Sequence, residues 1–108
     1  MTQAEALALS LVVEVPVVLA VARRACSAVR LALIAVAATL VTHPFAWLAN
    51  GWIPLPFAPR AALIEASVVV AEAVIYGRLV PLGAPRAALA SVMANAASFA
   101  VGLVLVRL

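Results

Sequence analysis

Residues 65–76 read Glu65-Ala-Ser-Val-Val-Val-Ala-Glu72-Ala-Val-Ile-Tyr76. In a helix, which advances about 100° per residue, the two carboxyl groups and the phenol fall within an arc of roughly 40° and the remaining surface is almost entirely hydrocarbon. A carboxylate at the centre of a membrane helix costs about 2.5–3.5 kcal/mol, so two of them require protonation or polar partners on neighbouring helices. We therefore expect this stretch to lie inside a helical bundle.

The composition of the whole chain indicates an integral membrane protein. Of its 108 residues, 69% are hydrophobic and 10% are charged, whereas a soluble domain is about half apolar and a quarter charged. One membrane crossing takes about 20 residues, so the chain has room for four crossings and short connections. The sequence predicts an all-α fold, an integral membrane four-helix bundle that forms a single domain over residues 1–108, with spans at about residues 5–22, 27–49, 61–80 and 86–106.

Polar residues mark one face of each predicted span. In the first span Ser10 and Glu14 share a face, and Pro16 predicts a kink. In the second, His43 precedes Pro44, which predicts a kink or a frayed turn because proline removes a backbone donor. In the fourth, the small and polar residues that share a face are Ser91, Asn95, Ser98 and Gly102. We expect this face to pack against the acidic face of the third span.

The arginines predict how the chain is oriented. The connections near Arg23/Arg24 and Arg78/Arg86 carry most of the positive charge, and Arg30 lies nearby, whereas Arg60 and Arg107 lie toward the other side. By the positive-inside rule those two connections are cytoplasmic, and both termini and the 50–60 loop are outside. This loop holds Asn50-Gly51, three prolines and aromatic residues, and it is expected to be the longest connection and to lie at the membrane interface. The arginines are scattered, so nucleic acid is not an expected partner.

Counting residues from the ends of the spans places polar groups from all four helices at similar depths. Glu14, Glu72 and Asn95 fall near the middle of the membrane, and His43 and Glu65 fall in the outer half. The predicted polar core or proton or ion site contains Glu14, His43, Glu65, Glu72, Tyr76, Asn95 and Ser98.

Two interpretations of this core remain open. Buried carboxyl groups beside a histidine can exchange protons or bind ions, and such residues inside a membrane are functional candidates. Alternatively, the polar groups only join the helices through hydrogen bonds, each worth about 0.6 kcal/mol.

Metal binding and catalysis are the alternative functions. His43 with Glu65 or Glu72 could form part of a metal site, but a catalytic zinc site uses three protein ligands, and the Glu-x-x-His pattern of di-iron bundles is missing. His43 could pair with Ser98 as a base and nucleophile, although no nucleophile motif surrounds that serine. The sequence therefore assigns no cofactor, metal or reaction.

In length, in its four spans and in Glu14 of the first span, the chain is similar to the small multidrug resistance transporters. Glycine-rich and aromatic-rich segments that are expected in that family are missing, and the polar residues here lie mainly on the other three spans. We do not assign the chain to that family. Since four helices enclose no aqueous pathway alone, the expected partners are the lipid bilayer and either further copies of the chain or a larger membrane protein.

Overall fold

The structure, a computed structural model, describes residues 2–107, with side chains up to Leu105. It confirms the predicted all-α four-helix bundle. The helices are α1 (Gln3–Val21), α2 (Ala28–Trp52), α3 (Phe57–Leu79) and α4 (Ala84–Arg107). Arg107, one of the two arginines expected on the outer side, has a side chain outside the described part.

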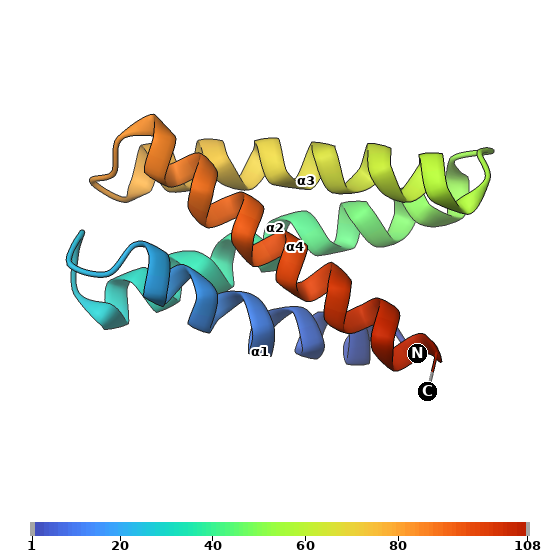
Figure 1. Ribbon diagram of the computed structural model, residues 1–108, viewed down its shortest axis with the longest axis horizontal. Coiled ribbons are helices and arrows are strands. Elements are labelled where there is room, and N and C mark those ends of the chain that lie inside the picture. The colour runs from blue at the N-terminus through green and yellow to red at the C-terminus, as the bar shows by residue number, and fades with distance from the viewer. Residues whose placement is uncertain (1, 108) are drawn as a thin grey trace.

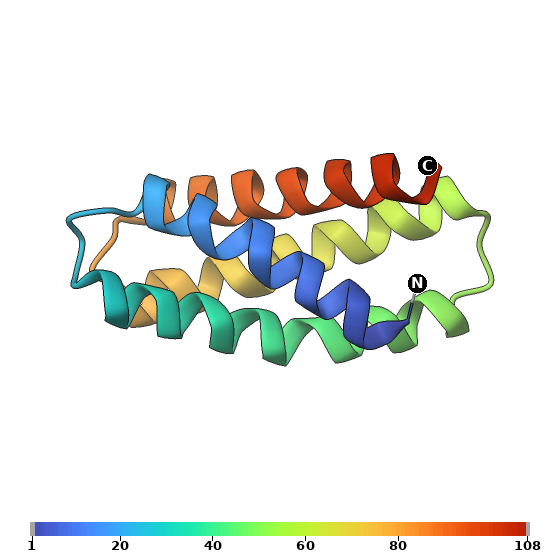
Figure 2. The same cartoon turned by 90° about the horizontal axis from the view of Figure 1, so that it is seen from below.

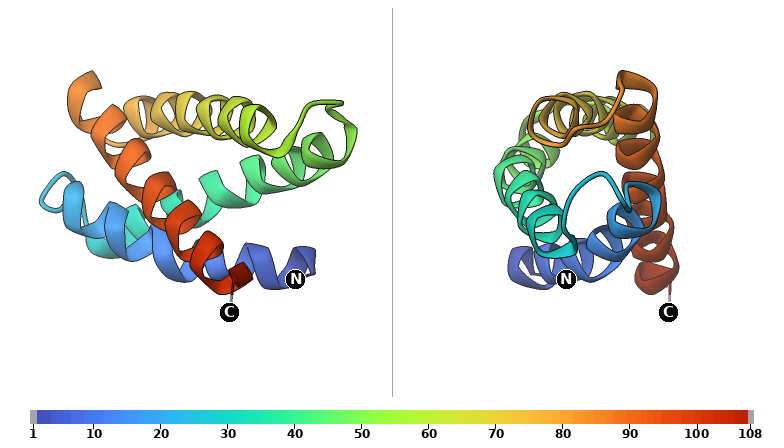
Figure 3. Two further views of the ribbon diagram at one scale, coloured as in Figure 1. Left: turned by 45° about the vertical axis from the view of Figure 1, so that its right-hand side comes forward. Right: turned by 90° about the vertical axis from the view of Figure 1, so that its left-hand side faces the viewer.

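The four helices form a ring in which each packs against two others (Figure 3). α1 contacts α2 and α4, and α3 also contacts α2 and α4, so α1 and α3 lie diagonally across the ring. The 22–27 and 80–83 connections lie together at one end, which we call the closed end (Figure 1). The 53–56 connection lies at the opposite end, the open end, toward which the two chain termini also point (Figures 1 and 2).

Three of the helices are long and apolar enough to cross a membrane: α1, α2 and the Ala84–Leu105 part of α4. α3 is as long, with 23 residues, but it carries two glutamates and has an arginine near each end. The long axis of the molecule measures 39 Å, which exceeds the roughly 30 Å hydrocarbon core of a bilayer.

Hydrogen bonds at the helix ends explain where several helices begin and end. Thr2 and Glu5 form a reciprocal capping box at the start of α1, and the Ser27 hydroxyl accepts a hydrogen bond from the Arg30 backbone N–H at the start of α2. At the closed end, the Arg86 guanidinium donates to the carbonyl oxygen of Val21 at 3.1 Å. Arginine side chains at a helix C-terminus satisfy carbonyls that have no partner within the helix.

The predicted loop at residues 50–60 is wrong in its bounds. α2 continues through Gly51 to Trp52 and α3 begins at Phe57, so the connection covers only residues 53–56 and the 22–27 connection is the longer one. Pro59 lies in the first turn of α3, where its missing N–H has no partner to lose. The second span therefore extends beyond residue 49. Pro16 and Pro44 both lie inside continuous helices, and no frayed turn occurs at His43.

The packed interior occupies the closed half of the bundle. In α1 the buried residues lie between Glu14 and the closed end, and in α3 they lie between Glu72 and the closed end. In the same way, the buried residues of α2 lie between the closed end and Thr42, and those of α4 between the closed end and Asn95. The apolar core consists of Val18, Ala22, Leu31, Ala35, Ala38, Tyr76, Val80, Ala87, Ala90 and Ala94. Six of these ten residues are alanines, and such small side chains allow neighbouring helices to pack closely.

Candidate functional site

A polar cavity of about 60 Å³ lies between all four helices, on the open-end side of the packed core. Here 'above' means toward the open end, and 'beneath' or 'below' means toward the closed end. It is lined by all of the predicted site residues except Tyr76, namely Glu14, His43, Glu65, Glu72, Asn95 and Ser98. The other lining residues are Ser10, Thr39, Thr42, Ala46 and Val68. The structure thus brings together side chains that are far apart in the sequence.

Tyr76 differs from the other predicted site residues because it does not line the cavity. Its side chain is 1% exposed and belongs to the packed core, one helical turn from Glu72 toward the closed end. Its hydroxyl oxygen has no hydrogen-bond partner. Tyr76 therefore helps to seal the bundle beneath the cavity.

The carboxyl groups in the cavity are deeply buried and incompletely satisfied. Glu14 is 4% exposed and Glu72 is 1% exposed, and one oxygen of each, Oε1 of Glu14 and Oε2 of Glu72, has no hydrogen-bond partner. The hydroxyl of Thr39, which is 2% exposed, is also without a partner. A buried polar atom without a partner costs about 1–3 kcal/mol, so water or a ligand in the cavity would stabilise this arrangement.

The electrostatic character of the cavity follows from its lining. It contains three glutamates and one histidine, and none of the arginines whose side chains the structure describes lines it. Carboxyl and hydroxyl oxygens are hydrogen-bond acceptors and ligands for hard cations, whereas an anion would meet no positively charged partner other than a protonated His43. The site is therefore suited to a proton or a small cation.

The polar face of α4 positions the donors of the site. The Asn95 side-chain Nδ2 donates to the Ser91 carbonyl at 2.9 Å, and the Ser91 hydroxyl donates to the Val69 carbonyl of α3 at 2.7 Å. Asn95 and Ser98 line the polar cavity together with Glu14 and Glu72. The expected packing of this face against α3 is present.

A larger cavity of about 330 Å³, which we call the vestibule, lies at the open end. It shares Ser10, His43, Ala46, Glu65 and Ser98 with the polar cavity, so the two spaces are adjacent. Its remaining walls are mainly apolar and aromatic, and they include Trp47, Phe57, Phe99 and Gly102. The polar cavity is thus bordered by a hollow on the open side and by packed side chains on the closed side.

His43 and Glu65 line both spaces, as expected for two residues of similar depth. The His43 ring stacks on Trp47 with a centroid distance of 6.2 Å, and its Nδ1 is buried without a hydrogen-bond partner. His43 and Glu65 therefore lie together at the boundary between the vestibule and the polar cavity, but His43 Nδ1 forms no hydrogen bond to Glu65.

The geometry gives little support to a zinc or di-iron type of metal site with His43 or to catalysis. Among the described residues, no group of three or more histidine, cysteine, aspartate or glutamate side chains is arranged to hold a metal ion. The Ser98 hydroxyl donates to the Asn95 carbonyl at 3.2 Å, so its proton is directed at the main chain and away from the His43 imidazole. A serine nucleophile is activated by donating its hydroxyl hydrogen bond to a general base, and Ser98 does not donate to His43 in this way.

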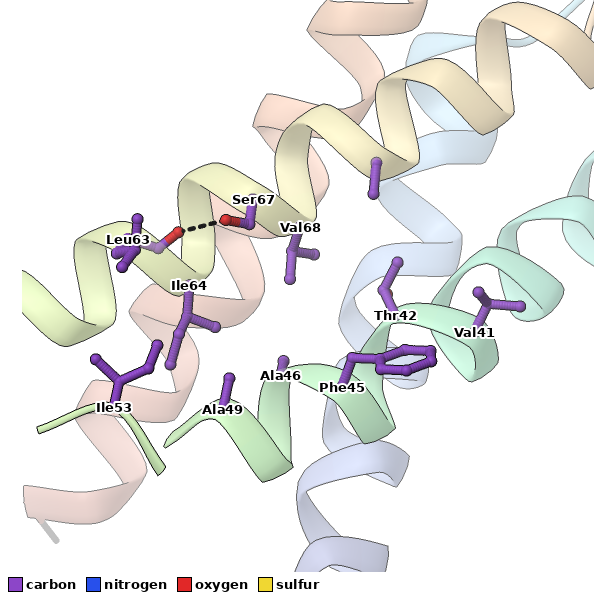
Figure 4. Close-up of a pocket in the computed structure, with 11 residues that line it drawn as sticks. Val41, Thr42, Phe45, Ala46, Ala49, Ile53, Leu63, Ile64, Ser67 and Val68 are labelled. Atoms are coloured by element: carbon purple, nitrogen blue, oxygen red, sulfur yellow. Dashed lines mark hydrogen bonds between the residues drawn. The ribbon is translucent and has the colours of Figure 1, made fainter. Parts of the chain in front are cut away.

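Apolar grooves flank the site on the outside of the ring. One groove, between α2 and α3, has a volume of about 450 Å³ and is lined by residues such as Val41, Phe45 and Ile64 (Figure 4). Its serine, Ser67, donates to the Leu63 carbonyl within its own helix at 2.9 Å. Ala46 and Val68 border both this groove and the polar cavity, so they form part of the wall between lipid-facing surface and polar interior.

Sequence reasoning did not include Ser10, Thr39 and Thr42 among the site residues. Thr42 donates to the Ala38 carbonyl at 3.0 Å, a bond that any helical threonine can form, whereas Thr39 lacks a partner. The signal that could have identified them is position, because Thr39 and Thr42 precede His43 on one face of α2.

Comparisons of the chain with protein family models, curated proteins and solved structures find no match.

Proposed function

We propose that this chain is a small membrane protein that takes up a proton or a small cation from the outer side of the membrane into the polar cavity. The proposal is carried by one observation: Glu14 and Glu72 border a small cavity that has packed side chains on one side and the vestibule on the other. Ionisable groups at membrane depth normally mark an ion or proton site.

The proposed orientation has four crossings. Because α3 connects the end of α2 to the start of α4 and runs antiparallel to both, a membrane that α2 and α4 cross must also be crossed by α3. The closed end carries Arg23, Arg24, Arg30, Arg78 and Arg86, and the positive-inside rule makes that end cytoplasmic. The vestibule then opens outward.

The proposed working form is an oligomer or a complex with a larger membrane protein. The core below the cavity leaves no route through a single bundle to the closed end, so one copy can bind a cation but cannot conduct it across the membrane. Transport would need movement of the helices or a second subunit at the site. A binding subunit of a larger complex would need neither.

The experiment is a binding measurement on the purified full chain in detergent. Proton uptake is followed with a pH indicator after a small acid pulse, and binding of sodium and potassium is followed by titration calorimetry. We expect the wild type to bind at least one of these cations and the Glu14→Gln/Glu72→Gln variant to lose that binding. The variant Glu5→Gln is the control, since Glu5 is exposed and glutamine also suits a capping box. Equal binding by the wild type and the double variant would reject the proposal.

A further inference from the structure

Two segments of the sequence repeat each other. Residues 30–38 read Arg-Leu-Ala-Leu-Ile-Ala-Val-Ala-Ala, and residues 86–94 read Arg-Ala-Ala-Leu-Ala-Ser-Val-Met-Ala. They share arginine, alanine, leucine, valine and alanine at corresponding positions. The first segment lies near the start of α2 and the second near the start of α4.

The structure extends this correspondence to two helical hairpins, α1–α2 and α3–α4. Within α2 and α4, the buried residues Leu31, Ala35, Ala38 and Thr39 recur at the same spacing as Ala87, Ser91, Ala94 and Asn95. Along α1 and α3 and their C-cap residues Ala22 and Val80, the buried residues Glu14, Val18 and Ala22 recur as Glu72, Tyr76 and Val80. The two hairpins therefore bury equivalent positions.

The arginines that begin the repeated segments make equivalent contacts. Arg86 of α4 donates to the Val21 carbonyl at the end of α1, at 3.1 Å, and Arg30 of α2 reaches the Leu79 carbonyl at the end of α3, at 3.5 Å. Each hairpin thus caps the first helix of the other. This exchange is what a two-fold axis along the bundle would produce.

This approximate symmetry makes Glu14 and Glu72 equivalent positions. Each lies about two helical turns from the closed end of its helix, and the diagonal arrangement of α1 and α3 puts the two carboxyl groups on opposite sides of the cavity. Thr39, one of the buried hydroxyl groups in the same cavity, has no hydrogen-bond partner.

We propose that Glu14 and Glu72 form a single two-fold site that holds one positive charge, a proton or an alkali cation, between their carboxyl groups. This inference rests on the proposed function and specifies its stoichiometry: one charge for the pair and not one for each glutamate. Like charges close together in a poorly solvated site disfavour each other, and one shared cation relieves that repulsion.

The ligand chemistry follows from the size and donors of the cavity. A space of about 60 Å³ has room for a few water molecules or one small ion. A calcium ion takes six to eight oxygen ligands and magnesium requires a near-ideal octahedron, which suits larger and more regular ligand sets. A singly charged ion with Thr39 and water as additional ligands fits better.

The hairpins differ at the boundary with the vestibule. The position of His43 in α2 is taken by Phe99 in α4, and the position of Glu65 in α3 is taken by Leu7 in α1. Among the described side chains, the other titratable groups that face the pair are His43 and Glu65 on the vestibule side and Tyr76 on the closed side. They lie on α2 and α3 only, so the access route is asymmetric although the paired site is symmetric.

The test compares single and double variants of the full chain in detergent: Glu14→Gln, Glu72→Gln, Glu14→Gln/Glu72→Gln, and Glu5→Gln as the control. Proton uptake per chain and the heat of sodium or potassium binding are measured for each, and circular dichroism confirms that each variant remains helical. For a shared site, each single variant loses as much binding as the double variant, because neither carboxyl group holds the charge alone. If the bound charge is a proton, proton uptake is observed in a buffer that contains no alkali cation. If it is an alkali ion, adding sodium or potassium at constant pH releases or absorbs heat of binding.

Two independent glutamates give a different result. Each single variant would then keep about half of the wild-type binding, and this would overturn the paired site while leaving the proposed cation function intact. A wild-type chain that binds neither protons nor alkali cations would instead reject the proposed function itself. If the glutamine variants lose their fold, Glu14→Asp and Glu72→Asp replace them. A shared site then requires each aspartate variant to weaken all of the binding, whereas two independent glutamates would leave about half of it at wild-type affinity.

Discussion

Glu14 of α1 and Glu72 of α3 border one small cavity from diagonally opposite helices, and each has a buried carboxyl oxygen without a hydrogen-bond partner. Below this pair the bundle is filled by small apolar side chains and Tyr76, and above it lies the vestibule. The proposed uptake from the open end requires this difference between the two ends.

Asn95→Leu should destabilise the bundle. Asn95 is 3% exposed, lines the polar cavity with Glu72 and donates to the Ser91 carbonyl, so leucine removes a buried donor from a cavity rich in acceptors, at a cost of about 1–3 kcal/mol. Unfolding in mixed detergent micelles measures the change. Val92→Leu, at a position 47% exposed on the same helix, is the control and should leave stability nearly unchanged. Equal stability of the two variants would contradict the packing role of Asn95.

Arg86→Lys should weaken the closed end without changing the charge that sets orientation. The Arg86 Nη2 donates to the carbonyls of Val21 at 3.1 Å and Arg23 at 3.4 Å, and lysine replaces the rigid guanidinium by a strongly hydrated ammonium on a flexible stem. We expect a loss of about 0.5–1.5 kcal/mol in the free energy of unfolding. The exposed residue Arg78 provides the matched control, Arg78→Lys. A larger loss for the Arg78 variant would show that the Arg86 contacts are unimportant.

Cysteine labelling tests the orientation. In a Cys26→Ser background, Leu55→Cys in the 53–56 connection should react with a membrane-impermeant thiol reagent added outside intact cells. Gly83→Cys in the 80–83 connection should react only after the membrane is opened. The reverse pattern would place the closed end outside and would reverse the direction of access.

The vestibule should admit water-soluble reagents. Gly102 lines it and has no atom within 4 Å of an added Cβ, so Gly102→Cys fits without displacing a neighbour. Its rate of reaction with a small charged thiol reagent should far exceed that of Ala90→Cys, at a fully buried position of the closed half. Similar, slow rates at both positions would mean that water does not enter the open half.

His43→Gln and Glu65→Gln should impair access to the site and leave assembly unchanged. Both residues lie at the boundary between the vestibule and the polar cavity, so their loss should slow cation uptake. The measurement is the rate of proton or alkali cation uptake, with membrane insertion and oligomeric state followed in parallel. If both variants take up cations at the wild-type rate, the two residues have no role in access and the polar boundary is structural.

Much of this arrangement could be predicted from the sequence because membrane helices leave few choices. The position of Glu72 on α3 and the polar face of α4 follow from helical periodicity, and the hydrophobic length of each run limits the number of crossings. The extension of α2 through Gly51 could not be predicted, since Asn50-Gly51 is a common turn signal. In the structure the Asn50 side-chain oxygen instead accepts a hydrogen bond from Arg60 Nε of α3 at 3.0 Å. The burial of Tyr76 beneath the cavity also depends on three-dimensional packing, because Tyr76 shares a helix face with Glu72.

Infrared difference spectroscopy on sealed vesicles tests the central claim most directly. The chain is reconstituted in one orientation, and the pH or the sodium concentration is changed on one side at a time while carboxyl absorption is recorded. The account predicts a carboxyl signal when the solution at the open end changes, little signal when the solution at the closed end changes, and loss of the signal in Glu14→Gln/Glu72→Gln. A wild-type signal that is absent from both sides, or that is unchanged in the double variant, would contradict it.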